Sequence, residues 1–502
     1  MRRIFFVMLA GMLIFSGCKT TETQTDVSVS IPLSGQFSMS AENKPSPGEL
    51  PDDFPRKSID KRQDTDTVLN PEPWWQFLGS DDLDHLIEQA LVLNFDLKTL
   101  DARLAQARAT ISKTDAAFFP LLDFSFGGQK KHTRIKTSSG SSPRTDGSHS
   151  WDGSLSGSYS PDVWGEYDAD KKAALMSHDA AAQDLSAFRF ELTVNIVQTW
   201  VDIIAARHKK QILHEQIKTN DTVLKLLKLR FRNGKATALD ISQQQEAIAE
   251  VNAQLPLLEK QEQVLIHALA LLSGKTTADG IQLKTVAFDQ FSPLPDIGIP
   301  SDLLKNRSDI QAARMRLLSA TWDIKAAKAD LLPSFSLTAR ALFSSGKLDL
   351  LFQNWVATLA ASIAGPLFDG GQRHAEIERV KAVVQEKVNL YAAVVARAVF
   401  EVEDSLISIQ KQDQYVRLLE QELAIARVAL RDALVQYQNG KSSYLNYLTA
   451  QAGVQRLERQ LAGEQSSCVK ERIGLYKSLG GKGASGIHPS GNRPVASDGG
   501  VE

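Results

Sequence analysis

Cysteine is nearly absent from this chain of 502 residues. Cys18 and Cys468 are the only two, which excludes a disulfide framework and a cysteine-based zinc cluster. An excess of charge is also missing, because 57 basic residues nearly balance 59 acidic ones and leave a formal net charge of −2. The sequence therefore has no general electrostatic attraction for nucleic acid, and we expect no such partner.

Catalytic and metal-binding motifs are missing as well. The nine histidines are scattered, and none lies at the paired spacing that metal sites use. Carboxylate pairs at Asp81-Asp82 and around Glu403-Asp404 are explained more simply as solvated helix surface, and no nucleophile is paired with a base. We therefore predict a protein that is not an enzyme and that holds neither a metal ion nor a dissociable cofactor.

The longest hydrophobic run lies at the N-terminus. Arg2 and Arg3 precede an apolar run over residues 4–15, which ends in Ser, Gly and Cys at 16–18. This order is typical of a secretory signal, here residues 1–17, and the run is shorter than the about 20 residues of a transmembrane helix. An uncleaved membrane anchor is the alternative.

Polar segments flank the informative part of the chain. Residues 18–70 are rich in Thr, Ser, Pro and Asp and lack periodicity, which predicts an extended N-terminal arm. Residues 481–502 are rich in Gly, Ser and Pro and are predicted to be a disordered tail. The remaining residues, 71–480, contain the folded structure.

This folded part repeats itself. Asp96 and Pro120 recur as Asp309 and Pro333, both 213 positions later, and the Asn-Gly-Lys of 233–235 recurs 206 positions later. Such an internal repeat indicates duplication of one structural unit. We therefore predict a first repeat over residues 71–290 and a second over residues 291–480.

Each repeat is predicted to be a helix, two strands and a long helical hairpin. Period-two alternation predicts strands at 121–134 and 150–160 in the first repeat, and at 334–345 and 354–365 in the second. Helical patterns of 68 residues then run over 166–233 and 372–439, each about 100 Å long. Glycines near positions 234 and 440 turn the chain back.

Neither part of such a unit is complete alone. A helix of about 100 Å does not form a compact globule, and four strands with one apolar face leave their edges unpaired. Assembly of several chains into a tube satisfies both. The predicted fold class is therefore mainly α with a β-barrel part, built from a duplicated helix–strand–strand–helix–helix unit.

An ordered series of motifs resembles the TolC-like outer-membrane factors, in particular the lipoprotein branch of resistance-nodulation-division efflux systems. In chain order the motifs are Trp74-Trp75 with Phe77, Ala90…Asn94…Asp96…Ala107-Arg108, Tyr159…Asp162…Trp164-Gly165, Pro300…Asp302-Leu303-Leu304, Arg307…Asp309-Ile310, Pro366…Asp369-Gly370-Gly371 and Leu475-Tyr476…Leu479-Gly480-Gly481.

The resemblance implies a homotrimer in which each chain gives four strands to a 12-stranded outer-membrane β-barrel. The helices of the three chains are expected to form a long periplasmic α-helical barrel. Apolar strand faces would then meet lipid. Trp151, Tyr159 and Trp355 are placed at membrane interfaces, with packing at a strand end as the alternative for each.

The resemblance also implies functional residues at the hairpin tips. Asn233, Gly234 and Lys235 of the first tip and Asn439, Gly440 and Lys441 of the second are expected to contact a periplasmic adaptor protein. The alternative is that both are simply good turn sequences.

A gate is expected just beyond these tips. Leu445 matches a residue that narrows the entrance, with ordinary interhelical packing as the alternative. Thr449 stands where the family often has an aspartate that forms an acidic ring, which predicts a constriction less attractive to cations. Tyr437, Arg230 and Asp240 are expected to make polar contacts that hold the gate closed.

The predicted function is that of an outer-membrane exit duct, which passively conducts small toxic compounds from an inner-membrane pump and its adaptor. Cys18 would carry covalent lipid such as palmitate, although Phe15 stands where leucine is usual in lipoprotein signals. An outer-membrane duct for protein secretion by an ATP-driven exporter is an alternative. A periplasmic coiled-coil protein without a pore is another, but it would not need four amphipathic strands.

Overall fold

The computed structural model describes residues 74–135, 144–277, 283 and 300–481. The predicted signal segment, Cys18, the N-terminal arm and the tail from residue 482 lie outside the described residues.

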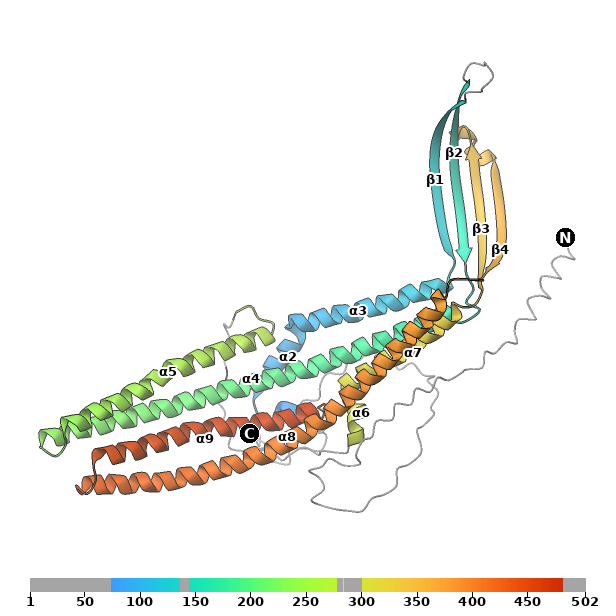
Figure 1. Cartoon of the computed structure of the whole chain (residues 1–502). Coiled ribbons are helices and arrows are strands. Elements are labelled where there is room, and N and C mark those ends of the chain that lie inside the picture. Colours follow the sequence, from blue (N-terminus) through green and yellow to red (C-terminus); the bar gives the residue numbers. More distant parts are fainter. Residues whose placement is uncertain (1–73, 136–143, 278–282, 284–299, 482–502) are drawn as a thin grey trace, which may run out of the picture. The chain divides into compact units, whose positions relative to one another are not determined.

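The described elements follow one plan twice (Figure 1). The first half contains η2 (Trp74–Leu78), α2 (Asp81–Leu93), α3 (Phe95–Asp115), η3 (Ala116–Phe118), β1 (Leu121–Ile135), β2 (Arg144–Tyr159), α4 (Glu166–Arg232) and α5 (Ala238–Leu272). The second contains η4 (Pro300–Asp302), α6 (Leu303–Asn306), α7 (Ser308–Ala329), β3 (Ser334–Ser345), η5 (Leu348–Gln353), β4 (Trp355–Ala364), α8 (Gln372–Gln438) and α9 (Tyr444–Ser478). Equivalent helices have equal lengths, 67 residues in α4 and α8 and 35 in α5 and α9.

Both long helices begin with the same arrangement. A glycine in the left-handed region precedes each helix, Gly165 with φ of 75° and Gly371 with φ of 86°, a conformation that side chains disfavour. The Asp162 carboxylate accepts from the Asp168 N–H at 2.9 Å, and the Asp369 carboxylate accepts from the Arg373 N–H at 3.2 Å. These bonds satisfy N–H groups that the first turn of a helix leaves free.

The main hydrophobic core forms where η2 and α2 pack against α4, α5 and α9. Trp200 of α4 is its largest fully buried side chain. The ring of Trp74 stacks on that of Tyr476 with 5.4 Å between centroids. Asn94 accepts from the Leu97 N–H at 2.9 Å and donates to the Leu272 carbonyl at 2.9 Å, so one side chain starts α3 and holds the end of α5.

The interhelical seam of α8 is continuous. The residues that the sequence places at spacings near 3.5 are buried, apart from the half-buried Tyr391: Val380, Val384, Val395, Val402, Leu406, Ile409 and Leu419. This seam packs on α7 and α9.

Cys468 of α9 is also buried, which raises the pKa of its thiol to about 12 and keeps it unreactive.

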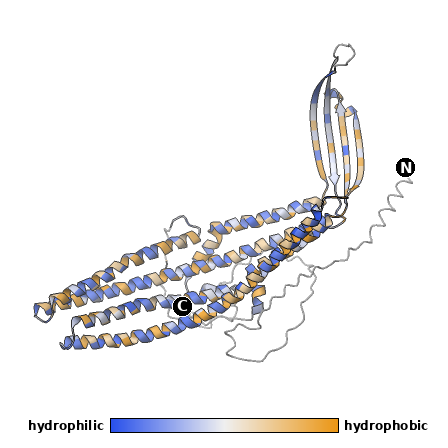
Figure 2. Cartoon of the chain, viewed as in Figure 1, coloured by the Kyte–Doolittle hydropathy of each residue, from blue (hydrophilic) through white to orange (hydrophobic). Residues whose placement is uncertain are grey.

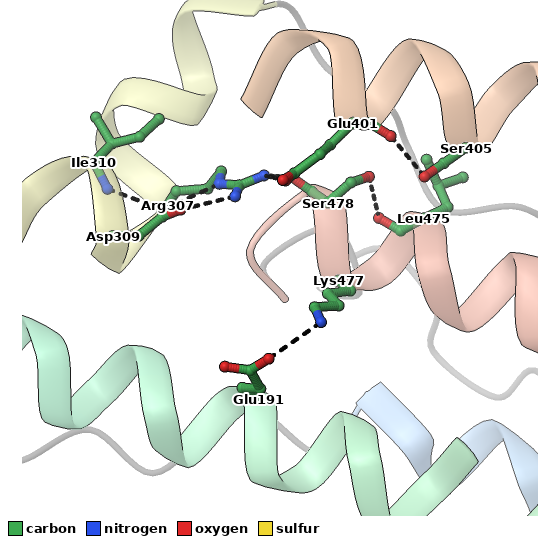
Figure 3. Close-up of polar contacts among 9 residues, drawn as sticks. All are labelled: Glu191, Arg307, Asp309, Ile310, Glu401, Ser405, Leu475, Lys477 and Ser478. Atoms are coloured by element: carbon green, nitrogen blue, oxygen red, sulfur yellow. Dashed lines mark hydrogen bonds and ion pairs between the residues drawn. The ribbon is translucent and has the colours of Figure 1, made fainter. Parts of the chain in front are cut away.

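Arg307 joins the two ends of the second repeat (Figure 3). Its guanidinium donates to both carboxylate oxygens of Asp309 at 2.8 and 3.1 Å, to Glu401 of α8 at 2.6 Å and to the Ser478 carbonyl at the end of α9 at 3.0 Å. Burial alone would raise the pKa of Asp309, but the hydrogen bonds and charge of Arg307 outweigh it and hold that pKa below its usual value. Next to this cluster, Lys477 donates to Glu191 of α4.

The strands form one antiparallel sheet in the order β1-β2-β3-β4. The central pair, β2 with β3, joins the two repeats through a register that runs from Trp151 opposite Ser345 to Tyr159 opposite Leu337. Neither β1 nor β4 has a second neighbour within the described part of the chain, so each is an edge strand.

The predicted start of the second strand at residue 150 is wrong. β2 begins at Arg144, and β1 continues to Ile135. Beyond the end of β3, these strands pair only with each other, from Gln129 opposite Ser150 to Ile135 opposite Arg144. Polar residues on both faces hide this two-stranded ribbon from a search for apolar alternation, because ladder hydrogen bonds hold it rather than a buried face.

One face of the sheet is apolar across all four strands. In register, Phe124 lies beside Leu155, then Ala341, then Ala357. Many apolar side chains of this face are exposed in the single chain, and the exposed fraction reaches 75% for Phe124 and 82% for Leu359. Figure 2 shows hydrophobic and hydrophilic residues along each strand.

The other face of the sheet is mainly polar. One of its layers is Asp123, Ser156, Arg340 and Thr358. Two hydroxyls on this face, those of Ser125 and Ser154, are hydrogen-bonded at 2.8 Å. The sheet therefore presents an apolar surface on one side and a wettable surface on the other.

The helices are mixed in polarity (Figure 2). Within the described residues, none has an apolar stretch of the length needed to cross a lipid bilayer. The same residues contain no group of three or more His, Cys, Asp or Glu side chains placed to hold a metal ion.

Candidate gate at the helical hairpin tips

The two hairpin tips have the same local structure. Asn233 donates its side-chain amide to the Leu229 carbonyl and Asn439 donates to the Val435 carbonyl, both at 2.9 Å. Gly234 and Gly440 follow with φ of 68° and 70°, and no atom lies within 4 Å of where a Cβ would stand. Glycine is therefore required by backbone conformation rather than by close packing.

Beyond the tips the two returning helices begin differently. α5 starts with a capping box, in which the Asp240 N–H donates to the Thr237 hydroxyl at 3.2 Å and the Thr237 N–H donates to the Asp240 carboxylate at 2.9 Å. The Ser443 side chain makes no such bond at the start of α9. The hydrogen bonds of Asp240 thus serve its own helix, and none of them joins it to Arg230 or Tyr437.

Arg230 and Tyr437 are brought together across the two hairpins. The guanidinium carbon of Arg230 lies 4.7 Å from the centroid of the Tyr437 ring, a cation–π contact rather than a hydrogen bond. Burial raises the pKa of Tyr437, Arg230 partly offsets this, and the nearby Asp240 carboxylate adds to it. Within the described residues the buried Tyr437 hydroxyl has no hydrogen-bond partner.

Two further tyrosines complete an aromatic cluster. The ring centroid of Tyr437 lies 5.4 Å from that of Tyr444 and 6.4 Å from that of Tyr447, and the last two are 5.8 Å apart. Leu227 of α4 belongs to the same buried group. All three rings belong to the second hairpin, and the first hairpin contacts them through Leu227 at the base of the tips.

A buried polar cluster lies next to these rings. We call it the amide cluster, and it consists of Gln216 and Asn220 of α4, Gln244 of α5, and Gln451 and Gln455 of α9. Asn220 is its centre, since its side-chain oxygen accepts from Gln451 at 2.8 Å and from Gln455 at 3.2 Å, and its carbonyl accepts from Gln244 at 2.9 Å.

Tyr444 connects the aromatic and amide clusters. Its hydroxyl donates to the side-chain oxygen of fully buried Gln244 at 2.5 Å. Burial raises the pKa of Tyr444, and Tyr447, Tyr437 and Asp240 raise it further, so the hydroxyl stays protonated and remains a donor. Sequence reasoning missed Tyr444 and the amide cluster, because amide side chains on a helix resemble ordinary surface residues.

The predicted constriction residues lie on an uncovered face of α9. Leu445 is 51% exposed, although its neighbour Tyr444 is buried. Thr449 follows one turn later and is also exposed, so the two share one side of the helix. Within one chain, Leu445 is thus not enclosed by interhelical packing. The tip lysines, Lys235 and Lys441, are exposed as well.

Paired long hairpins with glycine tips, joined to a sheet with one apolar face, are the fold of an outer-membrane efflux channel. The family model described as outer membrane efflux protein matches residues 86–275 and 299–481. The two matched segments correspond to the two repeats. The chain belongs to this family.

The sequence matches to relatives span most of this chain and most of each relative. The pyoverdine export outer membrane protein OpmQ of Pseudomonas aeruginosa is 30% identical over 412 residues, which are 81% of this chain and 87% of that protein. The toluene efflux pump outer membrane protein TtgC of Pseudomonas putida is 26% identical and covers 84% of this chain and 87% of its own.

Solved structures have the same fold. A crystal structure of CusC matches with a TM-score of 0.76 and 25% identity, over 82% of this chain and 95% of that one. The outer membrane protein VceC of Vibrio cholerae matches with a TM-score of 0.72 and 27% identity, over 82% and 99%. Together with the family match, these identify the protein as an outer-membrane efflux channel.

Tyr444→Phe is predicted to loosen the contact between the hairpins. The change removes one hydrogen bond and leaves the Gln244 oxygen buried without it, at a cost of about 1–2 kcal/mol. Hydrogen–deuterium exchange of backbone amides beside the amide cluster should become about five- to thirtyfold faster.

Tyr447→Phe is the matched control, because the Tyr447 hydroxyl makes no hydrogen bond within the described residues. It should leave exchange unchanged. Equal exchange in both variants would show that the Tyr444 bond does not join the hairpins.

Proposed function

We propose that the protein works as a homotrimer that forms the passive exit duct of a tripartite efflux system. Three chains contribute four strands each to one outer-membrane β-barrel, and their hairpins form a tunnel in the periplasm. An inner-membrane pump supplies the energy, and an adaptor connects the pump to the hairpin tips. The chain itself contributes a conduit and a gate.

The sheet is the observation that carries this proposal. Its apolar face contains side chains such as Phe124 and Leu359 that water covers in the single chain. Within the residues that the structure describes, its two edge strands each have hydrogen-bonding groups without a partner, and lipid cannot satisfy them. Closure with the sheets of two other copies pairs every edge, turns the apolar face to lipid and lines the interior with the polar face.

The helices supply the gate. Leu445 and Thr449 share the exposed side of α9 near its start, and three copies of this side would surround the tube axis as a narrow ring. Opening requires the second hairpin to move relative to the first. The contacts that resist this movement are the Arg230–Tyr437 pair, the bonds from Gln451 and Gln455 to Asn220, and the bond from Tyr444 to Gln244.

Small toxic compounds are the proposed cargo. The names of relatives refer to export of pyoverdine, to toluene efflux and to antibiotic efflux, and all of these cargoes are small molecules. This favours small-molecule efflux over a duct for secreted proteins. The amphipathic sheet in turn favours a pore over a coiled-coil protein without one.

The N-terminus adds an anchor to the proposal. Removal of residues 1–17 would leave Cys18 as the first residue, where covalent lipid would hold the polar arm at the membrane. The small residues at 16–17 and the apolar run before them support such processing. The anchor and the barrel would then act at the same membrane.

Thr449→Asp is predicted to raise the cation selectivity of the channel. Three new carboxylates around a narrow ring would attract cations and repel anions. The measurement is the reversal potential of the trimer in planar bilayers under a salt gradient. Thr449→Asn, which has similar size and no charge, is the control. Unchanged selectivity in Thr449→Asp would mean that Thr449 does not face the conducting path.

Mild cross-linking in cells, followed by mass spectrometry of the captured proteins, tests the assembly. The expected result is three species, namely further copies of this chain, a periplasmic adaptor and a proton-driven resistance-type pump. Capture of an ATP-driven exporter would instead support secretion. Absence of cross-links between copies of this chain would contradict the trimer.

A further inference from the structure

Along β1 and β2, the apolar face of the sheet, here called the outward face, changes character from one end of the strands to the other. Residues of β1 with even numbers share this face with residues of β2 with odd numbers, as the register shows. Nearest the helix connections the face is apolar, with Leu122 opposite Gly157 and Phe124 opposite Leu155. It then becomes aromatic and finally basic toward the end of the ribbon that is remote from those connections.

The aromatic level is a layer that spans the sheet. Phe126, Phe343 and Trp355 occupy one level of the register, on β1, β3 and β4. Trp151 stacks on Phe126 with 6.0 Å between ring centroids and an angle of 24°, and its ring covers Gly128 on the opposite strand. Aromatic side chains at one level of a membrane sheet mark the boundary between hydrocarbon and headgroups.

Basic side chains follow directly above this layer. Lys130 lies opposite His149, one level beyond Trp151 and about 7 Å further along the strand. His132 and Arg134 occupy the next two levels of the same face. All four side chains are exposed, and none makes a hydrogen bond or ion pair with another residue of the described chain.

Charge of the opposite sign is confined to the other face. The acidic residues of β1 and β2 within the described ranges are Asp123, Asp146 and Asp152, and the register places all three on the polar face. Above the aromatic layer, the outward face of these two strands therefore contains the cations Lys130 and Arg134 and no carboxylate among its described residues. Ordinary solvated surface contains positive and negative side chains in an even mixture. This part of the outward face does not.

We propose that Lys130, His132, Arg134 and His149 form a binding surface for the phosphate groups of outer-leaflet lipids. The inference rests on the proposed function, since it requires the sheet to lie in the outer membrane with the ribbon end outermost. Lipid phosphates lie just outside the hydrocarbon boundary, the level at which Lys130 and His149 stand. Ammonium and guanidinium groups bind phosphate through charge-assisted hydrogen bonds.

Titration with a phosphorylated lipid tests this surface. The probe is bisphosphorylated lipid A added to the detergent-solubilised trimer, and native mass spectrometry measures its dissociation constant. Lys130→Glu replaces an attractive charge with a repulsive one and should weaken binding about thirtyfold. Lys131→Glu is the matched control, because it makes the same change one residue away on the opposite face, and should alter binding less than twofold.

Two results would overturn the proposal. One is equal weakening by Lys130→Glu and Lys131→Glu, which would indicate general electrostatics. The other is equal binding of dephosphorylated lipid A, which would indicate acyl-chain packing alone. Channel conductance of the same preparations tests the proposed function separately. A wild-type protein without conductance would contradict the duct, whereas normal conductance with equal affinities would contradict only the lipid surface.

Discussion

The unpaired edges of the four-stranded sheet are the constraint on which the rest of the structure depends. Within the described part of the chain, β1 and β4 each present one row of backbone N–H and C=O groups without partners, and the sheet between them has an apolar face with many exposed side chains. Lipid can cover the apolar face, but it cannot satisfy the unpaired backbone rows, so the sheet must close. Each repeat brings two strands to this sheet, so the duplication and the β2–β3 pairing fix how much of a barrel one chain provides.

The helices must meet a different pair of requirements. They must stay rigid over about 100 Å, and they must still move at the end that contains the hairpin tips. In the middle of the long helices, contacts such as the Trp200 core and the Arg307 cluster hold the helices together. Toward the tips, the two hairpins are joined through amides around Asn220 and through the packing of Leu227 and Arg230 on tyrosine rings of the second hairpin. Buried amides specify one pairing of helices, yet each hydrogen bond contributes only modestly to stability. The contact between the hairpins is therefore well defined when the gate is closed, and few hydrogen bonds need to break when the gate opens.

Much of the fold could be predicted because special residues mark its boundaries. Gly165 and Gly371 start the long helices, and Gly234 and Gly440 follow their ends, so the predicted helices agree with the structure within one residue. Apolar residues of α8 that recur in the sequence at spacings near 3.5, such as Val395 and Val402, are buried. The ribbon before residue 150 could not be predicted, because backbone pairing holds it without an apolar pattern. The amide cluster was missed for a related reason, since Asn220 and Gln244 are separated in sequence and only the meeting of three helices buries them. Asp240 was assigned a partner across the hairpins, whereas its hydrogen bonds cap α5.

Disulfide cross-linking between sheet edges tests most directly the claim that copies of this chain close one another's sheets. In a Cys468→Ser background, one cysteine replaces Ser125 on β1 and a second replaces, in turn, Thr358, Ala360 or Ser362 on β4, all on the polar face. Oxidation of the membrane-embedded protein should give covalent dimers and trimers for at least one β4 position, and nothing larger. A ladder that extends beyond three chains, or no cross-link between chains at any of the three positions, would contradict a barrel closed by three copies.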